Sequence, residues 1–242
     1  MQPNGFTLTT KESSYKTTLD RLDENQRAAA MSESPKLVIK APAGAGKTST
    51  LIAAIAAYRY NNVNDRICAI TYTRAARAEL EARLTADGVH DVEVTTIHAW
   101  ARNRLEVLAH EHHFKIKILE EAAIKTILRQ LVDKYLLTSR VKYIDINILY
   151  TYITGSKKMD VSENYRRTLN ALDTRYVAYK RDNNLYDFTD YPLYLYDVLL
   201  AYNETINDID ALFVDEFQDV DEIQLQVFDK VLAKKKCFIG DS

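Results

Sequence analysis

Small and polar residues between a predicted strand and a predicted helix form the first candidate site. The strand is predicted over Lys36–Ala41 and the helix over Lys47–Tyr60. Between them, Gly44 and Gly46 allow the backbone to curl so that its N–H groups face a phosphate, beside the positive end of the following helix. A lysine directly after the second glycine can reach the β- and γ-phosphates of a nucleoside triphosphate. The pattern therefore predicts a phosphate-binding loop.

The predicted ligand of this loop is ATP together with Mg²⁺. The hydroxyl of Thr48 is expected to coordinate the metal ion. The general pattern has a glycine five residues before Gly46, where this chain has Ala41. A chance glycine-rich turn before a helix is the alternative, and the acidic segment described next argues against it. The residues expected to contact the nucleotide are Ala43, Gly44, Ala45, Gly46, Lys47, Thr48 and Ser49.

Two carboxylates follow a second apolar run, far away in the sequence. Ala211–Val214 is apolar at every position, which predicts a strand buried on both faces, and Asp215 and Glu216 come directly after it. Ligands of parallel sheets bind at the carboxyl ends of the strands. We therefore expect Asp215 to hold Mg²⁺ and Glu216 to orient and deprotonate the attacking water. Gln218 and Asp219 are candidates for coupling this site to a neighbouring element, with a plain turn as the alternative.

Strands that alternate with helices must position these residues. Such alternation predicts an α/β fold, in which a parallel sheet with right-handed crossovers is covered by helices on both faces. The last strand would end at the sheet edge without its following helix. The predicted strands are Lys36–Ala41, Arg66–Thr71, Val92–Thr95, Ala211–Asp215 and Lys236–Gly240, and the predicted helices are Lys47–Tyr60, Arg74–Leu84, His98–Ala109 and Glu222–Ala233.

The alternation stops between about Arg102 and Asp210, where the pattern is mostly helical. Glu120–Tyr135 and Ser162–Arg181 each place apolar or aromatic residues in a stripe along one face. We interpret this region as a helical insertion that leaves the α/β core. Most of the 16 tyrosines lie here. Such a stripe is typical of packing, and stacking on nucleic-acid bases is the alternative.

The composition is that of a globular protein and is silent about function. Of the 242 residues, 47% are hydrophobic and 27% are charged, and no apolar run is long enough to span a bilayer. Residues 1–18 are polar, which predicts a flexible tail and not a secretory signal. Cys68 and Cys237 lie in apolar runs, so buried, reduced thiols and a cytoplasmic location are expected. The net charge of −2 is compatible with nucleic-acid binding only through a locally basic groove.

Two other polar clusters have structural explanations. His110, His112 and His113 lie among charged residues on a predicted helix, so a solvated helix end is favoured over a metal site. The lysine run 234–236 is expected to cap the C-terminus of a helix and not to bind phosphate.

The two strong motifs together resemble those of the UvrD/Rep-type superfamily 1 helicases. The resemblance is carried by Ala-Pro-Ala-Gly-Ala-Gly-Lys-Thr, which ends at Thr48, and by Asp-Glu-Phe-Gln-Asp, which begins at Asp215. This family also accepts alanine at the position of Ala41. The resemblance implies a RecA-like P-loop NTPase fold and an ATP-dependent DNA helicase that moves 3′ to 5′.

Weaker segments follow the order of the same family. Leu22–Ala28 is similar to the Q motif, whose glutamine, here Gln26, reads the adenine edge. Ile70–Ala76 and Thr95–Trp100 are similar to motifs Ia and Ib. Leu185–Asp190 is similar to the Asp-Phe-acidic segment before motif II, and the segment from Phe238 to Ser242 looks like the opening of motif III. By resemblance, the path of single-stranded DNA would run along Thr71, Tyr72, Thr73, Arg74, Thr96 and His98. Tyrosine and arginine at positions 72 and 74 replace the usual phenylalanine and asparagine.

The resemblance also implies a division into domains. Residues 19–109 and 185–242 would form the ATP-binding domain 1A, and residues 110–184 the helical domain 1B. The chain stops inside motif III, so a second RecA-like domain would have to be supplied in cis or in trans, and the chain alone would be weakly active or inactive. Single-stranded DNA and junctions with double-stranded DNA are the expected partners, and no membrane is. The alternatives are a stand-alone nucleotide- or DNA-binding module and a split enzyme.

Overall fold

The computed structural model describes residues 18–42, 44–139, 141–155 and 159–241. Nearly all of the predicted tail, and the nucleotide contact expected at Ala43, fall outside these residues. The chain divides into two compact units. We call Met1–Arg104 with Leu195–Ser242 the sheet unit, and Leu105–Tyr194 the helical unit.

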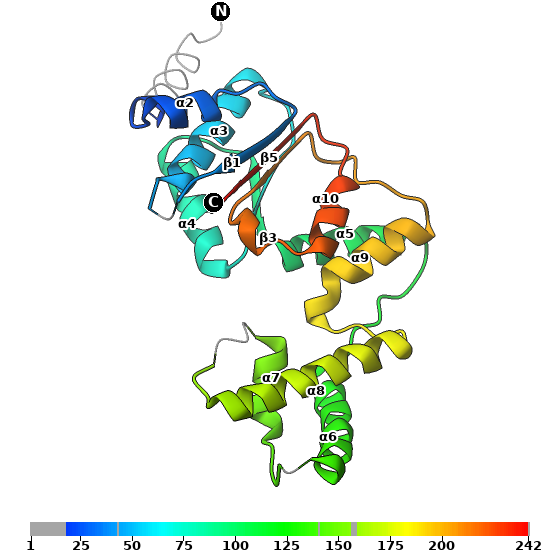
Figure 1. Cartoon of the computed structure of the whole chain (residues 1–242). Helices are drawn as coiled ribbons and strands as arrows, with labels where there is room; N and C mark the ends of the chain where they lie inside the picture. The colour runs from blue at the N-terminus through cyan, green and yellow to red at the C-terminus, as the bar shows by residue number, and fades with distance from the viewer. Residues whose placement is uncertain (1–17, 43, 140, 156–158, 242) are drawn as a thin grey trace, which may run out of the picture. The chain divides into compact units, whose positions relative to one another are not determined.

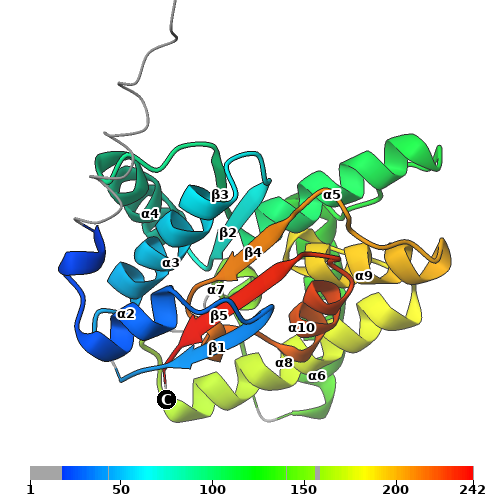
Figure 2. The same cartoon turned by 90° about the horizontal axis from the view of Figure 1, so that it is seen from above.

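Five parallel strands form the centre of the sheet unit (Figures 1 and 2). Their order in the sheet is β1-β5-β4-β2-β3, which confirms the predicted α/β class. The last strand, β5, was expected at the edge of the sheet, but it pairs with β1 on one side and with β4 on the other. The strands are β1 (Lys36–Lys40), β2 (Ile67–Thr71), β3 (Val92–Thr96), β4 (Ala211–Val214) and β5 (Lys235–Gly240).

Helices cover both faces of the sheet (Figure 2). On one face, α2 (Glu24–Ala30), α3 (Lys47–Asn61) and α4 (Arg74–Ala86) share a buried apolar cluster with alternate residues of the strands. On the other face, Trp100 of α5 (Ile97–Glu111) lies 6.0 Å from Phe228 of α10 (Glu222–Asp229), measured between ring centroids. Every residue of β4 is buried, as its continuous apolar run predicts.

Helix α10 is shorter than the sequence indicates. It was expected to reach Ala233 but ends at Asp229. The residues that follow leave the helix to pair with Ile206, which forms an isolated parallel bridge with Val231 and accepts a backbone hydrogen bond from Leu232 at 2.7 Å. The backbone pairing of a distant segment therefore overrides the local helical pattern.

The lysines expected at a helix end lie largely in β5. Lys235 and Lys236 are the first two residues of this strand and are both buried. The ammonium group of Lys236 reaches back to donate a hydrogen bond of 2.8 Å to the carbonyl oxygen of Phe228, in the last turn of α10. Burial lowers the pKa of both lysines. Lys236 therefore caps the C-terminus of a helix as predicted, but it does so from its position in β5.

The helical unit contains α6 (Glu121–Thr138), α7 (Ile146–Thr154), α8 (Glu163–Asp182), the 3₁₀ turn η1 (Phe188–Asp190) and the start of α9 (Tyr191–Ala201). Its three longer helices share one apolar core, in which the tyrosine stripe of α8 takes part. Tyr176 is completely buried and Tyr179 packs against the core from a half-buried position. The packing interpretation is confirmed for these two tyrosines.

A buried charge network ties the end of α8 to η1. The ammonium group of Lys180 lies 2.8 Å from Oδ2 of Asp187 and also contacts Asp190, and the Tyr176 hydroxyl donates to Asp187 at 2.9 Å. Burial opposes ionisation of Asp187, but Lys180 outweighs it and lowers the pKa of this carboxyl group. Burial and the charge of Asp187 raise the pKa of Asp190.

We expect Lys180→Met to destabilise the protein, because it leaves the buried carboxyl group of Asp187 and the half-buried carboxyl group of Asp190 without their cation. Removal of one partner from a buried ion pair costs about 3–5 kcal/mol. Urea-induced unfolding followed by circular dichroism measures the loss. The matched control is Arg167→Met on the same helix, whose pair with Glu163 is exposed on both sides and should contribute less than about 1 kcal/mol. Equal losses in the two variants would contradict the assignment of a buried network.

Candidate nucleotide-binding site

The carboxyl ends of the five parallel strands meet at one edge of the sheet. Because β5 lies between β1 and β4, the loop after β1, Asp241 after β5 and Asp215 after β4 lie side by side. The phosphate loop and the acidic segment, which the sequence predicts separately, therefore share one site. The backbone N–H of Ala41 donates to the carbonyl oxygen of Gly240 at 3.1 Å, which ties the start of the loop to β5.

The loop has the backbone that its glycines were expected to provide. Gly44 has φ = 80° and Gly46 has φ = 74°, both in the left-handed region that other residues rarely adopt. A Cβ atom at position 46 would also lie 2.8 Å from Nε2 of Gln26. Gly46 is the N-cap of α3, whose first residue is Lys47. The helix therefore points its N-terminus at the loop, as an anion site requires.

Gln26 lies against this loop. Its side-chain Nε2 donates to the carbonyl oxygen of Ala45 at 2.8 Å, and its Oε1 accepts from the backbone N–H of Asp23 at 3.0 Å. The same residue closes the capping box at the start of α2. Gln26 thus connects α2 to the phosphate loop. That it reads the adenine edge stays a prediction.

Lys47 is held between two carboxylates. Its ammonium group hydrogen bonds with Asp241 and lies 3.7 Å from Oε2 of Glu216, while only 11% of its side chain is exposed. The hydrogen bond with Asp241, opposed by burial and supported by the charge of Glu216, raises the pKa of Lys47. Lys47 is therefore fully charged near neutral pH. The contact with Asp241 was not predicted; this residue belongs to the segment that resembles the opening of motif III.

Asp215 and Glu216 have different environments. Asp215 is 5% exposed, and its burial raises the pKa of its carboxyl group, although the N–H of Glu216 donates to Oδ1 at 3.0 Å. Glu216 is partly exposed and has φ = 50°, a conformation that costs a residue with a side chain about 1–3 kcal/mol. Such strained positions are common at functional sites.

Gln218 joins the two strand ends. Its Nε2 donates to Oε2 of Glu216 at 2.8 Å, and its Oε1 accepts from the N–H of Asp241 at 2.7 Å. Gly240 leaves the space for this bridge, since a Cβ atom there would lie 2.6 Å from Oε1 of Gln218. Gln218 and Asp219 both belong to the 3₁₀ turn η2 (Phe217–Asp219), which starts directly after Glu216.

The donor set fits a hard cation. The buried carboxylate of Asp215 and the hydroxyl of Thr48, which is half-buried in the first turn of α3, are oxygen ligands of the kind that Mg²⁺ prefers. Ser49 was predicted to contact the nucleotide, and its hydroxyl accepts a hydrogen bond from Arg83 of α4 at 2.8 Å.

The residues predicted to contact DNA follow the neighbouring strands β2 and β3. Thr71 and Thr96 end these strands and are paired in register. Thr71 is completely buried, whereas Thr73 and Arg74 are exposed at the start of α4, which Thr73 caps through its hydroxyl. Tyr72, Thr96 and His98 are half-buried. The predicted DNA residues thus share one end of the sheet edge, next to the candidate nucleotide site.

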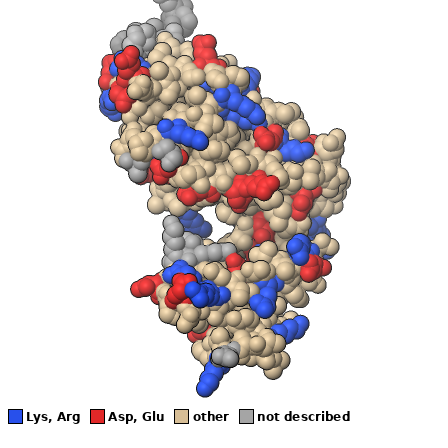
Figure 3. Space-filling view, viewed as in Figure 1, with Lys and Arg blue, Asp and Glu red and all other residues tan. Residues whose placement is uncertain are grey.

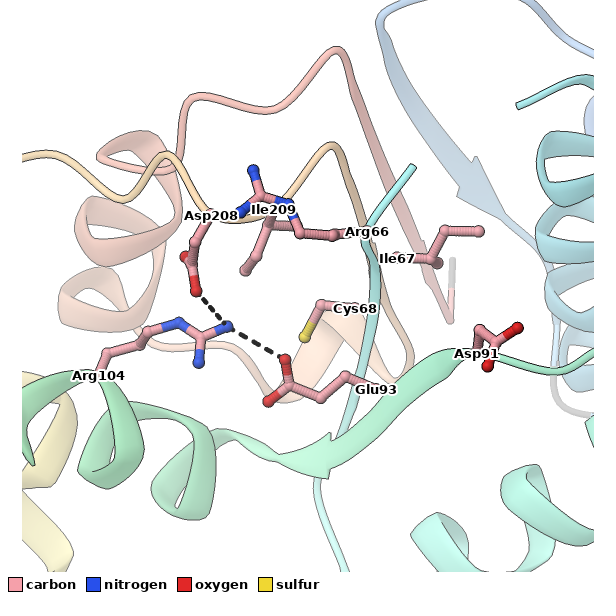
Figure 4. A pocket seen from close by; sticks show the side chains of 8 residues that line it. All are labelled: Arg66, Ile67, Cys68, Asp91, Glu93, Arg104, Asp208 and Ile209. Carbon is pink, nitrogen blue, oxygen red and sulfur yellow. Dashed lines mark hydrogen bonds and ion pairs between the residues drawn. The ribbon is translucent and has the colours of Figure 1, made fainter. Parts of the chain in front are cut away.

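A cavity of about 310 Å³ lies at the opposite edge of the sheet, near the amino ends of β2, β3 and β4 (Figure 4). Arg104 crosses it and pairs with Glu93 at 3.1 Å and with Asp208 at 3.2 Å. Cys68 also lines it, and burial raises the pKa of this thiol. Both cysteines are buried and free, as predicted. The cavity is thus separate from the candidate nucleotide site.

The distribution of surface charge in Figure 3 does not mark a further binding site among the described residues. On the face in Figure 3, acidic and basic side chains are interspersed in small groups. No helix in the described part of the chain combines the length and apolarity needed to cross a bilayer. Within the same residues, no group of three or more His, Cys, Asp or Glu side chains could hold a metal.

Comparisons with known proteins all point to one family of helicases. Residues 22–242 match the UvrD/REP helicase N-terminal domain. A probable DNA helicase II homolog of Mycoplasma capricolum subsp. capricolum is 28% identical over 233 residues, which cover 86% of this chain and 32% of that protein. The ATP-dependent DNA helicase PcrA of Leuconostoc citreum is 25% identical over 254 residues, covering 95% of this chain and 33% of that protein. The chain thus spans about a third of the length of these relatives. It belongs to the family of UvrD/REP helicase N-terminal domains.

Proposed function

We propose that this chain is the ATP-binding part of an ATP-dependent DNA helicase or translocase that moves 3′ to 5′ on single-stranded DNA. The observation that carries the proposal is the meeting of Lys47, Asp215 and Glu216 at the N-terminus of α3. Family membership and the names of the relatives support it.

Each residue of the site has a separate role in this proposal. Lys47 and the backbone of residues 43–49 bind the phosphates, and Thr48 and Asp215 hold Mg²⁺, which neutralises phosphate charge when it is bound. Glu216 orients the attacking water and accepts its proton. Lys47 is paired with acidic side chains, so a phosphate group takes over this cation from Asp241 and Glu216. That exchange releases the Glu216 carboxylate to act on water.

DNA would lie along the ends of β2 and β3. Thr73 and Arg74 are exposed there, and the half-buried Tyr72, Thr96 and His98 extend the same strip, whereas Thr71 is buried and can act only through its neighbours. The substrates we propose are single strands and their junctions with double strands. In this assignment, residues 19–109 and 185–242 are domain 1A, and residues 110–184 are domain 1B.

A second RecA-like domain, in cis or in trans, completes the motor in this proposal. The relatives are about three times as long as the stretch that this chain covers. Two such domains must close on the nucleotide, and an arginine from the second one is worth about 10³–10⁵ in turnover. We therefore propose that this chain alone turns over ATP slowly. Its cytoplasmic location also stays a prediction.

We expect Lys47→Ala to weaken binding of Mg·ATP at least about tenfold, because charge-assisted contacts with phosphate are lost. A fluorescent ATP analogue titrated into the purified chain measures the affinity. Lys40→Ala is the matched control, because this lysine is exposed at the end of β1 next to the loop. Equal affinities for the unmutated chain and the Lys47 variant would overturn the phosphate-loop assignment.

We expect Glu216→Gln to retain Mg·ATP binding and to lower hydrolysis about 10²–10⁴-fold, the usual contribution of a general base. Phosphate release measured with and without single-stranded DNA tests this. Glu222→Gln, exposed in the first turn of α10, is the control for a lost acidic charge. If Glu216→Gln hydrolyses ATP as fast as the unmutated chain, Glu216 is not the base.

A further inference from the structure

The order of the strands divides the sheet edge into two halves. The candidate nucleotide residues follow β1, β5 and β4, and the proposed DNA residues follow β2 and β3. The two halves meet where β4 lies beside β2. A signal that passes directly between them must therefore cross from the segment after β4 to the segment after β2.

The side chain of Tyr72 makes this crossing. Tyr72 follows β2 directly, and its hydroxyl lies within hydrogen-bonding distance of the backbone carbonyl oxygen of Asp219 and of Oε1 of Gln224. A phenol has one hydrogen, so it donates to one of these acceptors at a time, and both belong to the segment after β4. Burial raises the pKa of Tyr72 above its usual range, so the hydroxyl keeps this proton. Gln224 itself is 6% exposed.

The acceptor segment continues to the nucleotide site. The N–H of Asp219 donates to the carbonyl oxygen of Glu216 at 2.9 Å, and Gln218 bridges Glu216 and Asp241. Asp241 in turn is bonded to Lys47. A phosphate that displaces Asp241 from Lys47 therefore acts on a set of polar contacts that ends at Tyr72.

We propose that the Tyr72 hydroxyl is a positioning group that couples nucleotide binding to DNA binding. The inference rests on the proposed function and adds the contact through which the two ligands communicate. Thr73 and Arg74, the exposed residues that would touch DNA, follow Tyr72 directly and begin α4. A shift of η2 therefore reaches them through the Tyr72 side chain. Phenylalanine, which the family usually has at this position, would keep the ring and lose the contact.

The test compares Tyr72→Phe with the unmutated chain and with Tyr58→Phe. Tyr58 also donates a hydrogen bond within the sheet unit, to Asp65 at 2.7 Å, but close to the amino end of β2. The first readout is hydrogen exchange of the backbone amides of residues 217–221 in the free protein. Tyr72→Phe should speed their exchange about 2- to 10-fold, as the loss of one hydrogen bond permits, and Tyr58→Phe should leave it unchanged. Unchanged exchange in Tyr72→Phe overturns the contact.

The second readout is the ratio of dissociation constants for a fluorescent oligo-dT strand without and with a non-hydrolysable Mg·ATP analogue. Coupled sites change affinity about 5-fold or more. We expect such a ratio in the unmutated chain and in Tyr58→Phe, and a ratio below about 2-fold in Tyr72→Phe. The same ratio in all three proteins, or no coupling in an unmutated chain that binds both ligands, overturns the inference. Failure of the unmutated chain to bind nucleotide or DNA overturns the proposed function instead.

Discussion

The place of β5 in the sheet is the constraint on which the candidate site depends. A strand formed by the last described residues inserts between β1, near the start, and β4. This insertion brings Asp241 to Lys47 and places Gln218 against Gly240, where only glycine leaves room. Parallel pairing on both sides of β5 then fixes the height at which the strands end, because the register sets which residues lie opposite one another.

Charged groups of opposite sign lie together at the carboxyl ends of the strands. Lys47 is stabilised in its charged form by carboxylates, while the buried Asp215 resists ionisation because its burial is only partly offset. Lys47 is thus suited to bind an anion and Asp215 to bind a cation. A metal ion with its phosphates would supply both. The strained backbone of Glu216 is consistent with a site organised for binding and not for stability alone.

The sequence predicts those features that local patterns determine. The strands, the glycine conformations of the loop and the burial of β4 all follow from short runs of residue types. It does not predict contacts that depend on distant partners. The end of α10 is set by pairing with Ile206, and Lys235 is buried in a strand although its neighbours suggest a helix end. The partner of Lys47 and the burial of Thr71 likewise become visible only once the sheet order is known.

In the proposed function, the ion pair between Lys47 and Asp241 would make nucleotide binding an exchange of partners. In an exchange, an existing attraction between unlike charges is lost when the new one forms, so the net gain is smaller than for an unpaired lysine. Dissolved salt screens the old pair and the new one alike. Nucleotide affinity at such a site would consequently vary less with ionic strength than the number of phosphate charges suggests. In the free protein, the same ion pair holds the Lys47 side chain in an ordered position.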